Sequence, residues 1–156
     1  MKPIAFICTE TIPLPPEDIA EQILDVTKWL AFRGYGPIPG IKSAEFETRT
    51  HGIVGSRIRV KNLDGSSHVE EIAEWQPKRR LQLQMANFSP PLSGLATGFL
   101  EIWEFERVVN ETKVTRSFEL NAKSMLTKPV LWVIAFFLKQ AIGRHLTEMK
   151  RAANEP

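Results

Sequence analysis

Three charged residues occupy positions where the surrounding pattern expects apolar ones: Glu71, Glu101 and Arg116. A charge buried without a partner costs several kcal/mol. Such residues are therefore paired, reach solvent near a strand end, or supply the few polar groups of an apolar pocket. Arg116 beside Glu101 would be an ion pair suited to a carboxylate or phenol ligand. Glu71 and Glu101 would suit general acid and base catalysis if the pocket separated their pKa values.

The other reactive residue types predict no further site. His51, His68 and His145 lack metal-ligand spacing, either with one another or with Cys8. The glycines mark turns rather than a phosphate loop, and the sequence has no Gly-x-Ser-x-Gly motif. Cys8 lies in a predicted strand, where packing is the expected role. We therefore expect no metal and no cofactor.

The elements that must position these residues follow a simple order. Residues 4–12 read as a strand, Pro15-Pro16-Glu17-Asp18 begins a helix, and 26–32 form a second short helix. After Gly40 the apolar residues alternate, and turn-like pairs such as Asp64-Gly65 separate the segments. The predicted strands are 43–50, 56–62, 67–76, 81–88, 98–108 and 112–121, and a long helix closes the chain at 129–153. This order predicts an α+β fold with an antiparallel sheet around the closing helix.

Pairing across the predicted hairpins sorts the side chains into two faces. With Asp64-Gly65 as a turn, Val60 pairs with Val69, and Glu71 falls on the inner face. A last turn at Asn110-Glu111 or at Val109-Asn110 gives the same inner residues. Opposite the closing helix, the expected cavity-lining residues are Trp75, Met85, Phe99, Trp103 and Phe118, with Trp29 closing one end.

The first half of the closing helix, 130–137, is apolar on all sides. The longest predicted loop, 89–97, carries Leu92 and Leu95 beside Gly94. We expect Leu92 or Leu95 to pack on Trp132 or Phe136 as a movable cover, which adds both aromatic residues to the predicted ligand site. The alternative is that the side of the helix bearing Trp132 and Phe136 stays exposed and serves as a lipid-docking or dimer-forming patch.

Length and composition indicate one globular domain over residues 1–156, with 43% apolar and 24% charged residues. The net charge of +2 is too slight to indicate nucleic-acid binding. Cys8 is the only cysteine, which favours a reducing compartment, and we expect a cytoplasmic protein. The first eight residues do not resemble a secretory signal, and 129–138 is far short of the ~20 apolar residues that span a membrane.

Short segments at 12–19, 39–41, 55–60, 70–81, 103–106 and 145–150, together with Asp25 and Trp29, have an order and spacing that resemble the SRPBCC superfamily. This superfamily includes START lipid-transfer domains, birch-pollen-allergen-like proteins and polyketide cyclase/dehydrase-like proteins. The resemblance covers essentially the whole chain. It implies a helix-grip fold, in which a seven-stranded sheet grips the C-terminal helix and leaves a ligand tunnel between them.

Members of the superfamily differ in function, so the fold alone does not decide it. The leading hypothesis is binding or transport of a small hydrophobic molecule in the cavity, without catalysis. An alternative is a polyketide cyclase/dehydrase-like enzyme that uses Glu71, Glu101 and Arg116. A third is a regulatory or scaffold protein that acts through its surface. The expected partner is a small hydrophobic ligand and not a nucleic acid, with transient membrane contact or a homodimer as a further alternative.

Overall fold

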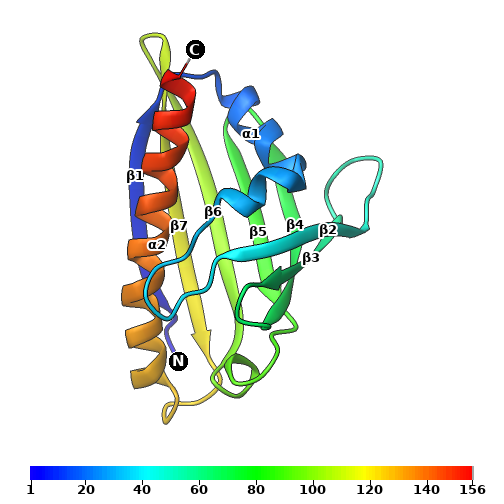
Figure 1. The fold of residues 1–156 in the computed structure, drawn as a ribbon, viewed down its shortest axis with the longest axis vertical. Helices are drawn as coiled ribbons and strands as arrows, with labels where there is room; N and C mark the ends of the chain where they lie inside the picture. Colours follow the sequence, from blue (N-terminus) through cyan, green and yellow to red (C-terminus); the bar gives the residue numbers. More distant parts are fainter. Residues whose placement is uncertain (156) are drawn as a thin grey trace.

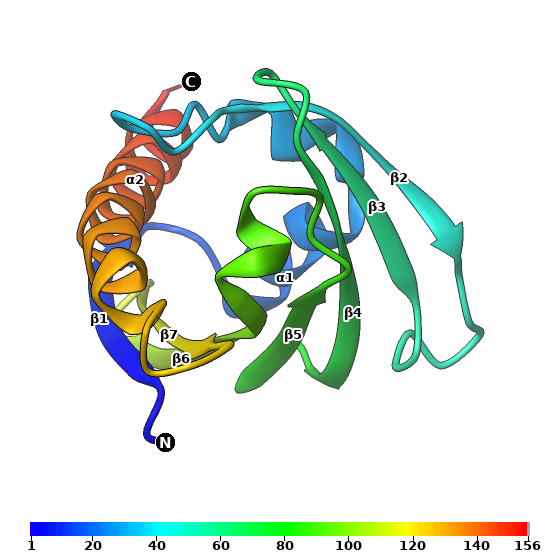
Figure 2. The same cartoon turned by 90° about the horizontal axis from the view of Figure 1, so that it is seen from below.

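The computed structural model describes residues 1–155, in which a curved antiparallel sheet of seven strands and a long helix along its β1 edge together form a ring (Figures 1 and 2). The strand order is β1-β7-β6-β5-β4-β3-β2. The elements are β1 (Ile4–Ile12), α1 (Pro16–Leu24), the 3-10 helix η1 (Val26–Ala31), β2 (Ile41–Thr48), β3 (Arg57–Asn62), β4 (Ser67–Gln76), β5 (Arg80–Ala86), the 3-10 helix η2 (Leu92–Gly94), β6 (Ala96–Val108), β7 (Glu111–Ala122) and α2 (Lys128–Asn154). The predicted helix-grip fold is confirmed.

The helices begin where the sequence favours them. Pro16 lies in the first turn of α1, and Glu17 and Asp18 complement the helix dipole there. Asp25 ends α1 and begins η1, because its side chain accepts a hydrogen bond from the Thr27 backbone N–H. The second predicted helix is therefore present as a 3-10 helix. Seen from below, η2 lies across the near end of the ring formed by the sheet and α2 (Figure 2).

One stripe of α2 faces the sheet. It comprises Leu131, Ala135, Leu138, Ile142 and Leu146, whose spacing of three or four residues places them on one side of a helix. The helix lies alongside the edge strand β1 (Figure 1). Among residues 1–155, none of the helices has an apolar run long enough to cross a membrane.

The core consists of two apolar clusters. One contains residues of α1, β3, β4 and β5 together with Trp103, Phe105 and Val114. The other lies at the beginning of α2 and includes Phe99 and Phe118. Along β6 the inner residues run Phe99, Glu101, Trp103, so Glu101 lies at the boundary between the clusters. The sheet thus places a charged residue in the middle of an apolar interior.

The predicted register of the β3–β4 hairpin was wrong by one residue. Val60 pairs with His68 rather than with Val69. The turn has three residues, not two, because Gly65 adopts a positive φ of 88° and the Asn62 backbone N–H bonds to the Ser66 carbonyl. A shift of one residue exchanges the faces of a strand, so Glu70 points inward and Glu71 outward.

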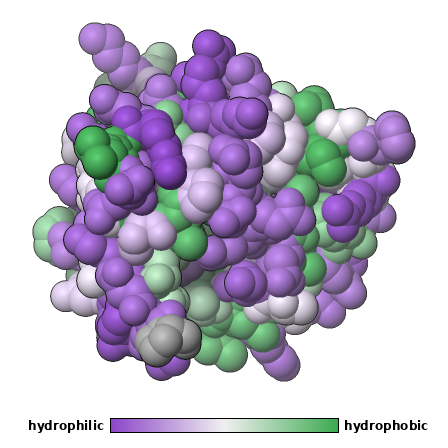
Figure 3. All heavy atoms as spheres, turned by 90° about the horizontal axis from the view of Figure 1, so that it is seen from above, coloured by the Kyte–Doolittle hydropathy of each residue, from purple (hydrophilic) through white to green (hydrophobic). Residues whose placement is uncertain are grey.

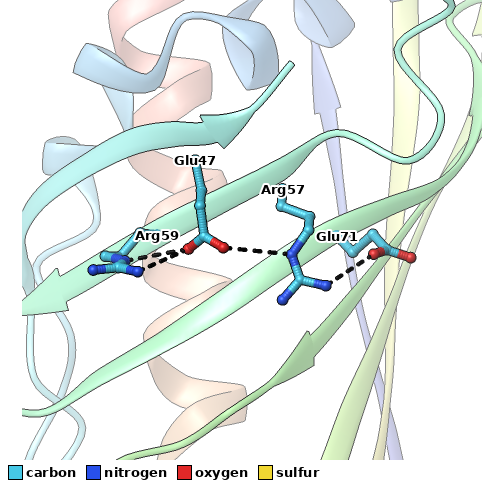
Figure 4. Close-up of polar contacts among 4 residues, drawn as sticks. All are labelled: Glu47, Arg57, Arg59 and Glu71. Atoms are coloured by element: carbon cyan, nitrogen blue, oxygen red, sulfur yellow. Dashed lines mark hydrogen bonds and ion pairs between the residues drawn. The ribbon is translucent and has the colours of Figure 1, made fainter. Parts of the chain in front are cut away.

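On the outer face, Glu71 joins a chain of ion pairs with Arg57, Glu47 and Arg59 (Figure 4). A bulge between Ile72 and Glu74 then restores the predicted faces, and Trp75 pairs with Leu81 as expected. In the last hairpin the structure has the second of the two registers considered, with Trp103 opposite Arg116.

The predicted cover of α2 was also wrong. Leu92 packs against the cluster that contains Leu131, on the inner side of the helix. Trp132 and Phe136 remain 56% and 60% exposed. The η2 loop therefore closes the end of the interior and leaves the outer face of the helix open.

Candidate functional site

A buried polar network crosses the interior from the sheet to α2. Arg116 on β7 donates from Nε to Oε2 of Glu101 on β6 at 2.6 Å, and its Nη2 contacts the same carboxylate. Its Nη1 lies 2.9 Å from Nδ1 of His145 on α2. Arg116 and Glu101 are only 5% and 3% exposed. Three elements thus meet at one guanidinium group.

The contact with Arg116 fixes the protonation of His145. A guanidinium only donates hydrogen bonds, so Nδ1 must be the acceptor and a neutral ring carries its proton on Nε2. Burial lowers the pKa of His145 to about 3, and the charge of Arg116 contributes to that shift. His145 is therefore neutral at physiological pH and offers an N–H donor at Nε2.

Two acidic groups share the interior. Burial raises the pKa of Glu101, and the nearby carboxylate of Glu70 raises it further, while Arg116 opposes both effects. Glu70 on β4 is itself buried, and its Oε2 lies 2.8 Å from Nε2 of His68. The predicted pair of Glu71 and Glu101 is therefore not formed, and Glu70 is the second buried carboxyl group in place of Glu71.

Aromatic rings enclose the guanidinium group of Arg116. Its central carbon lies 4.1 Å from the ring centroid of Trp103 and 5.7 Å from that of Phe118. A cation over a desolvated aromatic face is attracted by the ring quadrupole. Among residues 1–155, no buried side-chain nitrogen or oxygen lacks a hydrogen-bond partner. The buried polar atoms of the network are therefore all hydrogen-bonded.

The structure brings most of the predicted site residues to the inner face. Phe99, Trp103 and Phe118 are buried there, and Trp75 and Met85 are partly buried against the same clusters. Trp29 also packs on the core, and its Nε1 donates to the Ile23 carbonyl at 2.9 Å. The three exceptions are Glu71, Trp132 and Phe136, which lie on outer surfaces.

Sequence reasoning missed Glu70, His68 and His145. Glu70 and His68 were assigned to the wrong face because the turn at Asp64 was counted one residue short. A signal for His145 was available: it follows Leu138 by seven residues, on the side of α2 that bears the buried stripe. His145 extends the predicted Glu101–Arg116 pair, whereas Glu70 and His68 form a second pair on β4 whose carboxylate acts on Glu101 through its charge.

Two surface pockets lie near this network. A small one of about 10 Å³, room for about one water molecule, is formed by residues 31–34 and by α2, with His145 in its wall. A wider one of about 520 Å³ lies between β1 and α2 and is lined by Cys8, Lys139 and Arg144 among others. The residues expected to line an internal cavity are in neither pocket, so that cavity stays a prediction.

Comparisons with known proteins agree with this architecture. The family model described as "Polyketide cyclase / dehydrase and lipid transport" matches residues 6–154. No curated protein matches the sequence.

Solved structures with similar folds cover nearly the whole chain. A protein of Thermus thermophilus, TTHA0849, is 16% identical with a TM-score of 0.71, over 97% of this chain and 100% of its own. The major latex-like protein 151 of Panax ginseng is 16% identical with a TM-score of 0.68, over 100% of both chains. The protein Ara h 8.0201 is 15% identical with a TM-score of 0.64, over 93% of this chain and 98% of its own. At these identities the likeness concerns the fold.

Proposed function

Since the chain belongs to the polyketide cyclase/dehydrase and lipid transport family, we propose that it binds a small hydrophobic molecule between its curved sheet and α2. The observation that carries this proposal is the Glu101–Arg116–His145 network at the boundary between two apolar clusters. A ligand pocket typically combines an apolar lining with a few convergent polar groups. The inner face of this sheet has that composition.

Stability alone gives a weak reason for such a network. Replacing a buried ion pair by well-packed apolar residues is often neutral or stabilising. A role in recognition accounts for its presence: the ligand would place its apolar body among Phe99, Trp103 and Phe118 and a polar group near His145. Because Nδ1 is occupied by Arg116, the remaining donor of the ring is Nε2–H. A phenol, carbonyl or carboxylate oxygen would accept from it.

Nuclear magnetic resonance tests the placement of the ligand. Hydrophobic carboxylates and phenols would be titrated into 15N-labelled protein, with the indole and imidazole signals observed. The proposal expects shifts at Trp103 and His145 and none at the exposed Trp132. Shifts confined to Trp132 would place the hydrophobic contact on the surface and would reject the internal site.

A second candidate function is catalysis in the same interior, as in a cyclase or dehydratase. The observation that favours it is the buried pair of Glu70 and Glu101, together with the raised pKa of Glu101. A carboxyl group whose pKa is raised by burial suits general acid catalysis. Turnover that is lost in Glu101→Gln, while the hydrophobic molecule still binds, would favour the enzyme over the carrier.

A further inference from the structure

Exposed apolar residues gather on the outer side of the beginning of α2 and in the turn just before it, and are here called the α2 apolar face. It consists of Met125, Leu126, Val130, Trp132, Val133 and Phe136. Leu126 is 91% exposed, and the two aromatic residues are each more than half exposed. Single exposed apolar residues are common, but a clustered set on one helix face usually marks a contact surface.

The rest of the fold does not cover this face. The buried stripe of α2 is on its opposite side, at Leu131, Ala135 and Leu138. The segment at Tyr35 and Gly36 reaches the helix at Phe137, where the rings of Tyr35 and Phe137 lie 6.3 Å apart. That contact stops short of Trp132 and Phe136, which remain open.

The charged residues of the chain segments around the α2 apolar face are all basic, although Glu10 on β1 lines the wider pocket together with Lys139 and Arg144. Residues 120–147 contain no Asp or Glu, nor do the neighbouring segments 1–9 and 26–44, although the chain has 18 acidic residues. Those segments contact the helix, through the Lys128 Nζ donor to the Lys2 carbonyl and through Tyr35. The basic residues of the three segments are Lys2, Lys28, Arg33, Lys42, Lys123, Lys128, Lys139 and Arg144.

The other end of the molecule differs. Glu148 and Arg151 form an ion pair in the last turns of α2. The surface seen from that end is predominantly hydrophilic (Figure 3). The combination of exposed aromatic residues with flanking basic residues is therefore found at the beginning of the helix and its surroundings.

We propose that the α2 apolar face docks on the surface of a membrane that contains anionic lipids. Trp, Phe and Leu side chains would enter the boundary between headgroups and acyl chains, while the flanking lysines reach the phosphates with their flexible stems. Charge complementarity selects this occupant over a second copy of the chain. Two copies packed face to face would bring the same positive charges together with no acidic partner.

This docking mode would place the membrane beside the η2 loop. The Lys123 backbone N–H and the Thr127 hydroxyl both donate to the Leu95 carbonyl, each at 2.9 Å, so the residues just before α2 are tied to that loop. The η2 loop lies across the end of the interior (Figure 2). Docking itself does not depend on whether the interior binds a ligand.

Vesicle sedimentation tests the proposal. The full chain would be mixed with vesicles of phosphatidylcholine alone and with vesicles that also contain phosphatidylserine. We expect binding only to the second kind, and weaker binding as the salt concentration rises. Trp132→Ser with Phe136→Ser should lower the apparent affinity by about tenfold or more, because both rings leave the interface.

Matched variants distinguish docking through the α2 apolar face from nonspecific hydrophobic adsorption to vesicles. Leu63→Ser with Val109→Ser removes two exposed apolar side chains elsewhere and should leave binding unchanged. Lys128→Glu with Lys139→Glu should abolish binding, whereas Lys61→Glu with Lys113→Glu should reduce it much less.

Equal sedimentation with both kinds of vesicle, or none with either, would overturn the proposal. So would a dimer in analytical ultracentrifugation that the Trp132 and Phe136 substitutions dissociate, because the face would then belong to a second copy. If the protein bound vesicles but no ligand in its interior, the proposed function would be contradicted and the docking proposal would be unaffected.

Discussion

Arg116 is the residue on which the interior depends most, because it neutralises Glu101, bonds His145 and lies over Trp103. Its removal would leave the carboxylate of Glu101 buried without a counter-charge. Removing one residue of the Glu101–Arg116 pair is therefore strongly destabilising, whereas replacing both with apolar residues changes the free energy of unfolding little. That asymmetry makes the network experimentally separable from ordinary core packing.

Arg116→Met should lower the free energy of unfolding by about 3–5 kcal/mol, because it isolates a buried carboxylate. Glu101→Leu combined with Arg116→Met should recover most of that loss. Urea denaturation measures the free energy of unfolding of the single and the double variant. As a control, Arg57→Met removes a surface ion pair with Glu47 and Glu71 and should cost at most about 1 kcal/mol. If the double variant were no better than the single one, a separable ion pair would be the wrong description.

His145 makes stability depend on pH in a predictable direction. The unfolded ring takes up a proton near pH 6.5, whereas the folded ring does so only near pH 3. Between these values the unfolded state binds more protons, so stability falls as the pH falls through this window. The slope from His145 should approach about 1.4 kcal/mol per pH unit.

The measurement is the free energy of unfolding from pH 7 to pH 4 for the natural protein and for His145→Asn. Glu101 is present in both proteins, and its raised pKa acts in the opposite direction. The difference between the two curves therefore isolates His145. Parallel curves would show that the pKa of His145 is the same in the folded and unfolded states and would contradict its burial against Arg116.

The sequence allowed part of this network to be predicted. Glu101 and Arg116 interrupt long alternating strands, so their inward direction follows from the period alone. Glu70 could not be distinguished from its neighbour Glu71 because the choice depends on a three-residue turn and on the positive φ of Gly65. Because Glu70 and Glu71 are adjacent and of the same type, the alternation of the strand does not show which of them faces inward.

At the scale of elements, the segment between η1 and β2 supports the network from outside. The Phe32 ring packs edge-on against the His145 ring, with centroids 5.7 Å apart. The chain then turns at Gly34, which has a φ of 75°. A Cβ atom at this position would lie 2.1 Å from the Ile38 carbonyl oxygen. Only glycine fits this turn, which holds the segment against α2.

Gly34→Ala should therefore lower the free energy of unfolding by about 1–3 kcal/mol. Gly143 in α2 provides the matched case, because a Cβ atom there would meet no atom within 4 Å. Gly143→Ala should stabilise the protein by about 0.5–1 kcal/mol through the higher helix propensity of alanine. Thermal and urea unfolding check both changes. Equal effects of the two substitutions would contradict the role assigned to the Gly34 turn.

For the molecule as a whole, the order and number of strands and the closing helix followed from hydrophobic periodicity and turn residues. The segment that covers α2 could not be predicted in this way. A helix that is apolar all round implies neighbours on every side, but periodicity does not identify which of them are present. Leu92 turned inward to the core, and Trp132 and Phe136 were left open. This failed expectation locates the surface that we propose to dock on membranes.

Native mass spectrometry of the protein purified from its own cells tests the central claim most directly. The account predicts a one-to-one adduct with a small hydrophobic molecule that organic solvent extracts. Its occupancy should fall in the Glu101→Leu, Arg116→Met protein and persist in Trp132→Ser, Phe136→Ser. A protein that carries no adduct from its own cells and takes up none of the hydrophobic carboxylates or phenols offered to it would contradict the claim.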